Sequence, residues 1–183
     1  CTEFLGGGAR ETSSRGIPDH GLSRAAAYES PEQFAFAITN ELRNKLGYEQ
    51  VALGWIHRRR IRILSISGLD QVSGRSPGVA CLRAAMEECY DAGAVLIHPR
   101  LGDWADEKTC AEYPLHKQWC LATKGDCVAS ITLRSGGAVL AVLSLRTRSD
   151  RPFTPEQLEE VRAKVEPLVP GFAIQKSNPP IKS

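Results

Sequence analysis

The segment Cys127–Leu168 constrains the fold most strongly, because it predicts a buried hairpin followed directly by an amphipathic helix. Residues 128–133 alternate as a half-buried strand does, and Ser135-Gly136-Gly137 supplies a turn in which glycine permits positive φ. Residues 138–143 are all apolar, which predicts a strand that is covered on both faces. Such a strand requires other elements on both sides of its sheet.

The helix after this hairpin has a complete start signal. Thr154 fits the N-cap, Pro155 the first helical position, and Gln157 the third position of a capping box. One apolar stripe follows, made of Leu158, Val161, Val165 and Leu168. After Val169, the prolines at 170, 179 and 180 predict that regular structure fades.

Upstream, the folded part is expected to begin at Ser30, where Ser-Pro-Glu-Gln predicts a capped helix that ends at Gly47. The elements expected next are a hairpin with strands over 51–56 and 61–65, a helix from Ser76-Pro77 to Gly93, a strand over 94–98, an irregular loop over 100–113 and a short helix over 115–122.

Because the strands occur in adjacent hairpins, the sheet is expected to be antiparallel. The predicted fold class is α+β, with the terminal helices on one face of the sheet, short helices and loops on the other, and a pocket under the loop 99–113. The expected organisation is a flexible N-terminal linker over 1–29, one domain over 30–172 and a C-terminal tail over 173–183.

Over residues 30–172 this arrangement resembles a GAF domain. The matching segments are Phe34–Leu46, Val51–Ile56, Ile66–Leu69, Val128–Leu133, Ala138–Leu145 and Arg151–Leu158. Two positions depart from the family pattern: the proline before Leu133 is replaced by Thr132, and the second hairpin glycine is replaced by Ala141. The middle segment, Gly74 to Glu88, is similar to GAF domains fused ahead of HlyD-type efflux adaptor segments.

The resemblance implies a sensory or regulatory module with a pocket for a small molecule, and a homodimer formed through the terminal helices. It specifies no ligand and no cofactor, because the fold hosts several. The similarity to efflux adaptors would place the chain on the cytosolic side of a larger protein, in contact with a membrane only through parts outside this sequence.

Composition agrees with a soluble module. The 183 residues are 42% hydrophobic and 24% charged, and the net charge of +2 gives no broad cationic field, so no nucleic-acid partner is predicted. No apolar run approaches the roughly 18 residues of a transmembrane helix. The six cysteines form no C-x-x-C pair, which favours reduced thiols and a cytoplasmic location. Without an initiator Met, the chain is expected to be a piece of a longer protein.

The residues predicted to meet a ligand lie around the loop 99–113: His98, Arg100, Asp103, Trp104, Cys110 and His116. There, Trp104 would stack on a ring and Arg100 would bind a phosphate or carboxylate. The alternative is a solvent-facing loop in which Trp104 covers the sheet edge. Trp119 is expected to pack in the core.

A metal site is the first of three weaker hypotheses. His116 and Cys120 would share a helix face, but completing the site with Cys110 or Cys127 matches no standard ligand spacing, so no metal is predicted.

The second hypothesis is thiol chemistry, since free-methionine-sulfoxide reductases are GAF domains with pocket cysteines. Cys81 and Cys110 are the candidates, and either would need a depressed pKa and solvent access. The third concerns the basic cluster His57-Arg58-Arg59-Arg60 with Arg62, which is interpreted as a solvated turn in preference to a contact with nucleic acid or an anionic membrane.

The sequence therefore predicts a non-catalytic regulatory domain that binds a small molecule. The alternatives are a ligand-free dimerisation module of a larger membrane-associated protein and a thiol reductase.

Overall fold

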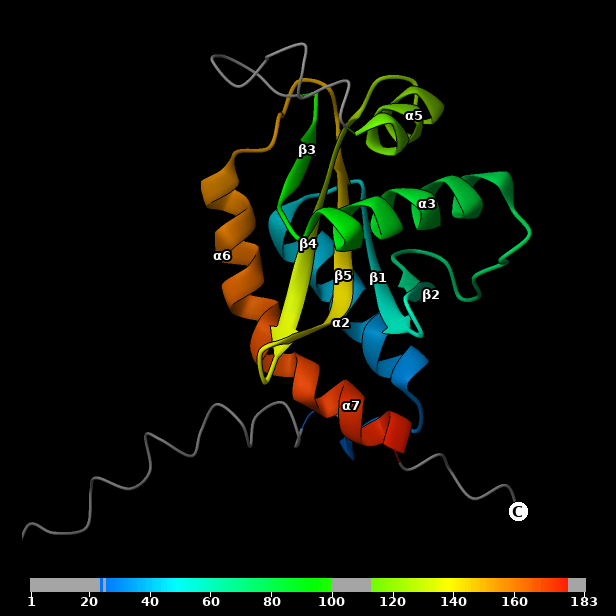
Figure 1. Ribbon diagram of the computed structural model, residues 1–183, viewed down its shortest axis with the longest axis vertical. Coiled ribbons are helices and arrows are strands. Elements are labelled where there is room, and N and C mark those ends of the chain that lie inside the picture. Colours follow the sequence, from blue (N-terminus) through cyan, green and yellow to red (C-terminus); the bar gives the residue numbers. More distant parts are fainter. Residues whose placement is uncertain (1–23, 25, 100–112, 178–183) are drawn as a thin grey trace, which may run out of the picture.

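A five-stranded antiparallel sheet forms the middle layer of the molecule, for which a computed structural model describes residues 24, 26–99 and 113–177, with side chains through Ala173 (Figure 1). The strand order is β2-β1-β5-β4-β3. The bounds are β1 Gln50–His57, β2 Arg60–Ile66, β3 Leu96–His98, β4 Cys127–Ser135 and β5 Ala138–Thr147. Every neighbouring pair is antiparallel, as the adjacent hairpins predicted.

Helices cover both faces of this sheet. In Figure 1, α3 (Pro77–Ala92) crosses in front of the strands and α2 (Pro31–Leu46) lies behind them. With α2, the rear face carries α6 (Pro155–Val165), a short 3₁₀ turn (Glu166–Leu168) and α7 (Val169–Ser177), whereas α5 (Pro114–Ala122) joins α3 in front. This arrangement confirms the predicted α+β fold, with terminal helices on one face.

The strand side chains divide between two hydrophobic cores. In β1, Val51, Leu53 and Trp55 pack toward α2, and Ala52 packs toward α3. Because both faces are covered, β4 is buried continuously from Cys127 to Leu133, where the sequence predicted a half-buried strand. In β5 the fully buried stretch is Ala141–Leu145, and the strand begins exposed at Ala138.

The helix starts follow the local sequence signals. Ser30 Oγ accepts the Gln33 N–H at 3.2 Å, and α2 ends at Gly47, whose φ of 69° is in the left-handed region. At α6 the capping box is complete, since Thr154 Oγ1 accepts from Gln157 N and Gln157 Oε1 accepts from Thr154 N. In α2 the corresponding Gln33 Oε1 accepts instead from Glu29 N.

The chain beyond Val169 differs from the prediction that regular structure fades there, because α7 continues to Ser177. Its Phe172 is 1% exposed, and its ring centroid lies 4.5 Å from that of Phe34 in α2 and 6.0 Å from that of Trp55. Pro170 is tolerated because the first turn of a helix needs no donor from that position. Burial of Phe172 therefore outweighs the proline signals.

Contacts also begin before residue 30. Arg24 Nη2 lies 2.8 Å from Glu41 Oε2, and the Tyr28 ring stacks 5.5 Å from Phe34. The linker assigned to residues 1–29 stays a prediction for residues 1–23, which lie outside the described part. None of the described helices is long and apolar enough to cross a bilayer.

Gly54 provides a test of the contact between β1 and α3. A Cβ built there would lie 2.5 Å from Ile61 Cγ2 and 2.8 Å from Met86 Sδ, so Gly54→Ala should lower the free energy of unfolding by about 1–3 kcal/mol. Gly78→Ala is the matched control, because the nearest atom to its added Cβ is 3.9 Å away; it should be neutral or slightly stabilising. Urea unfolding of both variants measures the difference, and equal values would contradict this packing.

Candidate functional site

Of the six residues predicted to meet a ligand, two can be placed. Arg100, Asp103, Trp104 and Cys110 lie outside the described residues. His98 ends β3 and His116 lies in the first turn of α5, so the two histidines stand at the two ends of the intervening segment.

His98 is half-buried on the edge strand of the sheet. Its pKa is lowered mainly by burial and further by the nearby His116 and Lys117, with Glu88 acting in the opposite direction. The imidazole is therefore neutral near pH 7 and can both donate and accept a hydrogen bond.

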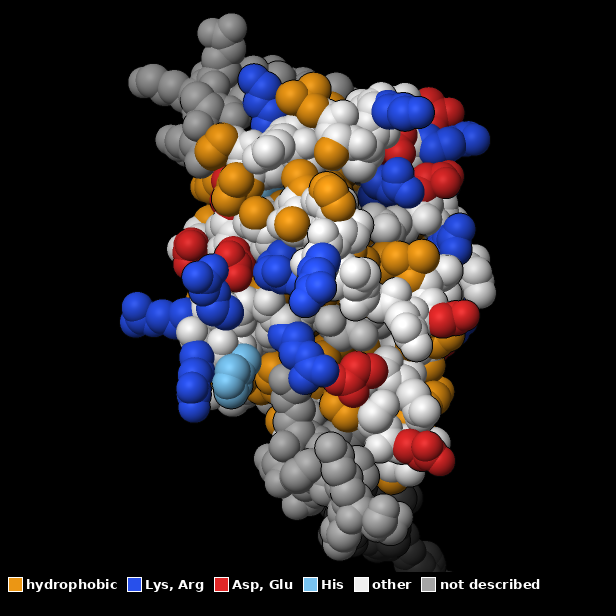
Figure 2. All heavy atoms as spheres, turned by 90° about the vertical axis from the view of Figure 1, so that its right-hand side faces the viewer, with side chains coloured by type: hydrophobic (Ala, Val, Ile, Leu, Met, Phe, Trp, Pro, Cys, Tyr) orange, Lys and Arg blue, Asp and Glu red, His pale blue; other side chains and the backbone are white. Residues whose placement is uncertain are grey.

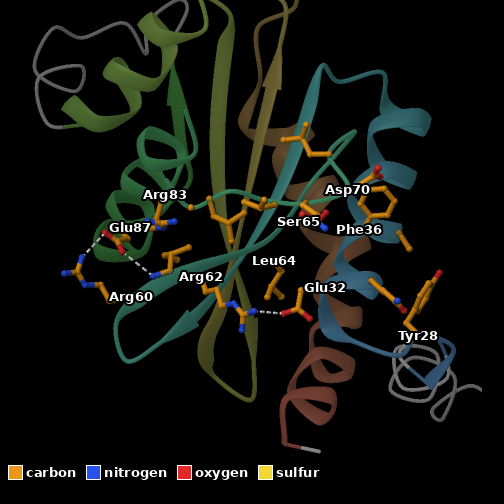
Figure 3. A pocket seen from close by; sticks show the side chains of 18 residues that line it. Tyr28, Glu32, Phe36, Arg60, Arg62, Leu64, Ser65, Asp70, Arg83 and Glu87 are labelled. Carbon is orange, nitrogen blue, oxygen red and sulfur yellow. Dashed lines mark hydrogen bonds and ion pairs between the residues drawn. The ribbon is translucent and has the colours of Figure 1, made fainter. Parts of the chain in front are cut away.

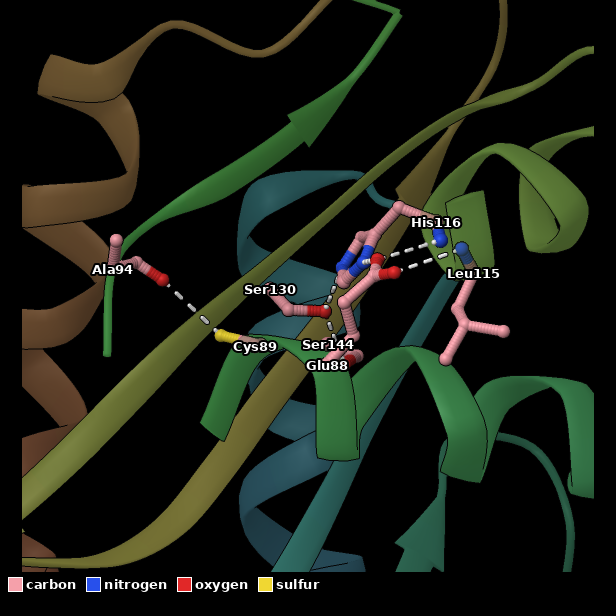
Figure 4. A network of polar contacts seen from close by, with 7 residues as sticks. All are labelled: Glu88, Cys89, Ala94, Leu115, His116, Ser130 and Ser144. Carbon is pink, nitrogen blue, oxygen red and sulfur yellow. Dashed lines mark hydrogen bonds and ion pairs between the residues drawn. The ribbon is translucent and has the colours of Figure 1, made fainter. Parts of the chain in front are cut away.

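His116 is the centre of a buried polar network (Figure 4). Its Nδ1 lies 2.7 Å from Glu88 Oε1, and its Nε2 lies 2.9 Å from Ser130 Oγ, which is 2.7 Å from Ser144 Oγ. Because an ionised carboxylate can only accept, the Nδ1–H of His116 donates to Glu88, and Nε2 is left to share a hydrogen bond with the Ser130 hydroxyl. The network joins α3, α5, β4 and β5.

Glu88 also caps α5, whose own N-cap residue Tyr113 makes no side-chain capping bond. Its two carboxylate oxygens accept the backbone N–H groups of Leu115 and His116, both at 2.9 Å. Burial alone would raise the pKa of Glu88, but the hydrogen bonds from the His116 ring and from these two N–H groups outweigh it, and the net pKa is lowered. A charged carboxylate at this position is further favoured by the helix dipole.

Of the residues in this network, His116 was predicted from the sequence, whereas Glu88, Ser130 and Ser144 were not. The available signal was a serine flanked by apolar residues in the middle of each of two strands. Ser130 and Ser144 are directly paired across β4 and β5 and are 0% and 1% exposed, so each needs a buried partner.

The order carboxylate, imidazole, hydroxyl also occurs in hydrolase triads. Here the serine hydroxyl is completely buried and already bonded to a second serine, so no substrate carbonyl can reach it. The arrangement holds α5 in place. The network also engages both ring nitrogens of His116, so neither is available as a metal ligand. In the described ranges, no group of three or more His, Cys, Asp or Glu side chains is placed to hold a metal ion.

The cysteines that the structure describes do not have the properties of reactive thiols. Burial raises the pKa of Cys81, Cys120 and Cys127, and raises that of Cys89 to about 12. Cys89 and Cys120 donate to the backbone oxygens of Ala94 and Asp126. Cys110, the second candidate thiol, lies outside the described residues.

A groove of about 1180 Å³ lies at a different place, along the outer side of β2. In Figure 3 its walls are α2, with Glu32 and Phe36, and α3, with Arg83 and Glu87. The sequence analysis did not predict this groove, because its walls come from segments about 50 residues apart in the chain.

Comparison with known proteins identifies the fold. No protein-family model and no curated protein sequence matches this chain. Among solved structures, the GAF domain of an Acinetobacter phosphoenolpyruvate-protein phosphotransferase matches with a TM-score of 0.57 and 8% identity, over 93% of this chain and 99% of that one. The GAF domain/HD domain protein of Geobacter sulfurreducens matches with a TM-score of 0.53 and 12% identity, over 84% and 99%. Free methionine-R-sulfoxide reductase of Neisseria meningitidis, solved with its substrate, matches with a TM-score of 0.53 and 11% identity, over 96% and 98%.

These similarities define the class of structure: the chain has a GAF-like fold, as the sequence resemblance implied. At such low identities they concern the fold alone, since one fold supports many functions.

Glu88 should make part of the stability depend on pH. A folded-state pKa below the ordinary glutamate value of 4.5 contributes stability above that pH, and this contribution is lost as pH falls through the folded-state pKa. The difference in unfolding free energy between the parent and Glu88→Gln should therefore be largest at pH 7 and shrink below about pH 4.5. Chemical unfolding across this range measures it, with the exposed Glu160→Gln as control, expected within about 0.5 kcal/mol of the parent throughout. A difference that does not change with pH would contradict the assignment.

Proposed function

We propose that this chain is a non-catalytic regulatory domain, which binds a small molecule beside His98 and α5 and transmits the binding event across the sheet. The observation that supports this proposal is the chain of hydrogen bonds from α5 through His116 to Ser130 and Ser144 in the central strands. A ligand that moves α5 must either move these strands or break the network.

The route through the sheet is short. Ser130 lies between Ala129 and Ile131, and Ser144 lies between Leu143 and Leu145; these four apolar neighbours pack in the core under α2, α6 and α7. Coupling of about 1–3 kcal/mol between pocket and helices is sufficient for signalling. The terminal helices would therefore carry the output.

We also propose that the chain forms a homodimer through its terminal helices. It would belong to a larger signalling or membrane-associated protein in the cytoplasm, such as one with the HlyD-type fusion. The large hydrophobic side chains that are exposed in the described part, Leu69 and Leu121, lie on neither terminal helix. We therefore expect a weak dimer whose population depends on concentration, measurable by light scattering after size exclusion.

The ligand-free module is the second candidate, because described side chains fill the space beneath α5. Trp119 is 4% exposed, as its expected core position requires, and His116 is 1% exposed. Under this alternative the network would be a structural clamp with no response to small molecules.

A thermal-shift panel of nucleotides, tetrapyrroles and small organic acids on the whole chain separates the two candidates. The regulatory proposal predicts that at least one compound raises the melting temperature in proportion to the logarithm of its excess over Kd. His98→Ala should weaken that response at least about tenfold in Kd, since hydrogen bonds to charged ligand groups are worth roughly 1.5–3 kcal/mol. His57→Ala, an exposed histidine on the β1–β2 turn, is the control. No shift with any compound would favour the ligand-free module.

The reductase alternative makes a different prediction. Because burial raises the pKa of Cys81, Cys81→Ser should leave any NADPH-coupled reduction of free methionine sulfoxide unchanged, and we expect no such activity above background in the parent. Activity that is present in the parent and lost in Cys81→Ser or Cys110→Ser would replace the regulatory proposal by the enzyme.

A further inference from the structure

The groove beside β2 has the features of a second binding site, separate from the ligand position proposed beside α5. It runs along the free side of an edge strand, since β2 pairs with β1 alone among the described strands. The wall residues come from α2, β2, the β2–α3 connection and α3. In Figure 2, which faces this side, several Lys and Arg side chains gather near the middle of the surface.

Apolar side chains make up part of the lining of the groove. They include Ile63 and Leu64 of β2, Phe36 of α2 and Val72 of the β2–α3 connection. Leu69 also lines the groove and is 46% exposed, although large aliphatic side chains usually turn inward. A ligand with an apolar body would cover this surface.

Charged side chains line the groove in unequal environments. Arg62 is paired with Glu32 at 2.8 Å, and Arg60 with Glu87 at 3.7 Å. The half-buried Arg83 makes no ion pair or hydrogen bond with any residue that the structure describes. Because the Arg83 guanidinium is not engaged by a carboxylate and none of its nitrogens is fully buried, Arg83 is the lining cation that is available to contact a bound anion.

The neighbouring turn adds positive charge at the end where Arg60 lies. Arg58 and Arg59 are its two central residues, with φ of 50° and 65°. Asn and Gly adopt this conformation at least cost, whereas arginines carry some strain there. Asp70 is the one opposing carboxylate on the wall besides the two paired ones, and it is exposed to solvent.

A strand from another protein fits this edge less well than a small molecule does. Glu87 Oε1 accepts the backbone N–H of Ile61 at 3.3 Å, so a side chain already occupies the edge of β2 where an added strand would pair (Figure 3). The volume of about 1180 Å³ is slightly above the roughly 300–1000 Å³ of typical small-molecule sites, so the groove has room for a small molecule.

From this combination we propose that the groove between α2, β2 and α3 binds a small organic anion, whose carboxylate or phosphate contacts Arg83 and whose apolar body lies on Ile63, Leu64 and Phe36. This site is independent of the ligand position beside α5, so either can fail without the other.

Calorimetric titration of the whole chain with 1-naphthyl phosphate and with 1-naphthoate tests the proposal and distinguishes the two anionic groups. At least one should bind saturably, and neutral 1-naphthol should bind at least about tenfold more weakly. Arg83→Gln should weaken binding of the anion by about tenfold or more and should change thermal unfolding of the free protein little, because Arg83 makes no hydrogen bond or ion pair with a described residue that is lost. Asp70→Asn should strengthen binding slightly, because it removes a like charge.

Arg134→Gln, an exposed arginine on the β4–β5 hairpin, is the control and should have no effect. Three results would overturn the proposal: no saturable binding of either anion, equal weakening by Arg83→Gln and Arg134→Gln, or binding that is lost in His98→Ala and kept in Arg83→Gln. The last result would assign the anion to the site beside α5.

Discussion

Burial of the sheet on both faces is the constraint on which the rest of this structure depends. The central strands β4 and β5 have almost no exposed side chain from Cys127 to Leu133 and from Ala141 to Leu145. Apolar side chains satisfy this condition by packing, but each polar side chain at such a position needs a hydrogen-bond partner inside the protein. The polar network of the molecule follows from this requirement.

The pairing of Ser130 with Ser144 shows the consequence. Two buried hydroxyls in adjacent strands require a further partner, which His116 supplies from α5, and the imidazole in turn requires Glu88 from α3. Glu88 then provides the cap that α5 lacks. One hydrogen-bonded cluster therefore fixes two helices on one face of the sheet. For this reason, a ligand that moves α5 would also affect the strands.

The two proposed binding positions lie at opposite edges of the sheet. His98 is on β3 and the groove with Arg83 lies beside β2; among the described strands, these two have one unpaired side each. Among the described residues, buried side chains pack on both faces of the central strands, whereas the edges bring connecting segments, helix ends and strand backbone together. Solved structures of 8% and 12% identity share this fold, and one fold supports many functions.

The sequence alone determined the elements and many of their ends, because these depend on near neighbours in the chain. The cap at Ser30, the capping box at Thr154 and the stop at Gly47 are local hydrogen-bonding or φ requirements, and the apolar stripes fixed which faces are buried. Only the tertiary structure decided which distant side chains meet: Phe172 on Phe34, Glu88 under α5, and Arg83 opposite α2. Those contacts depend on the relative position of elements that lie tens of residues apart, and no local propensity or spacing records that position.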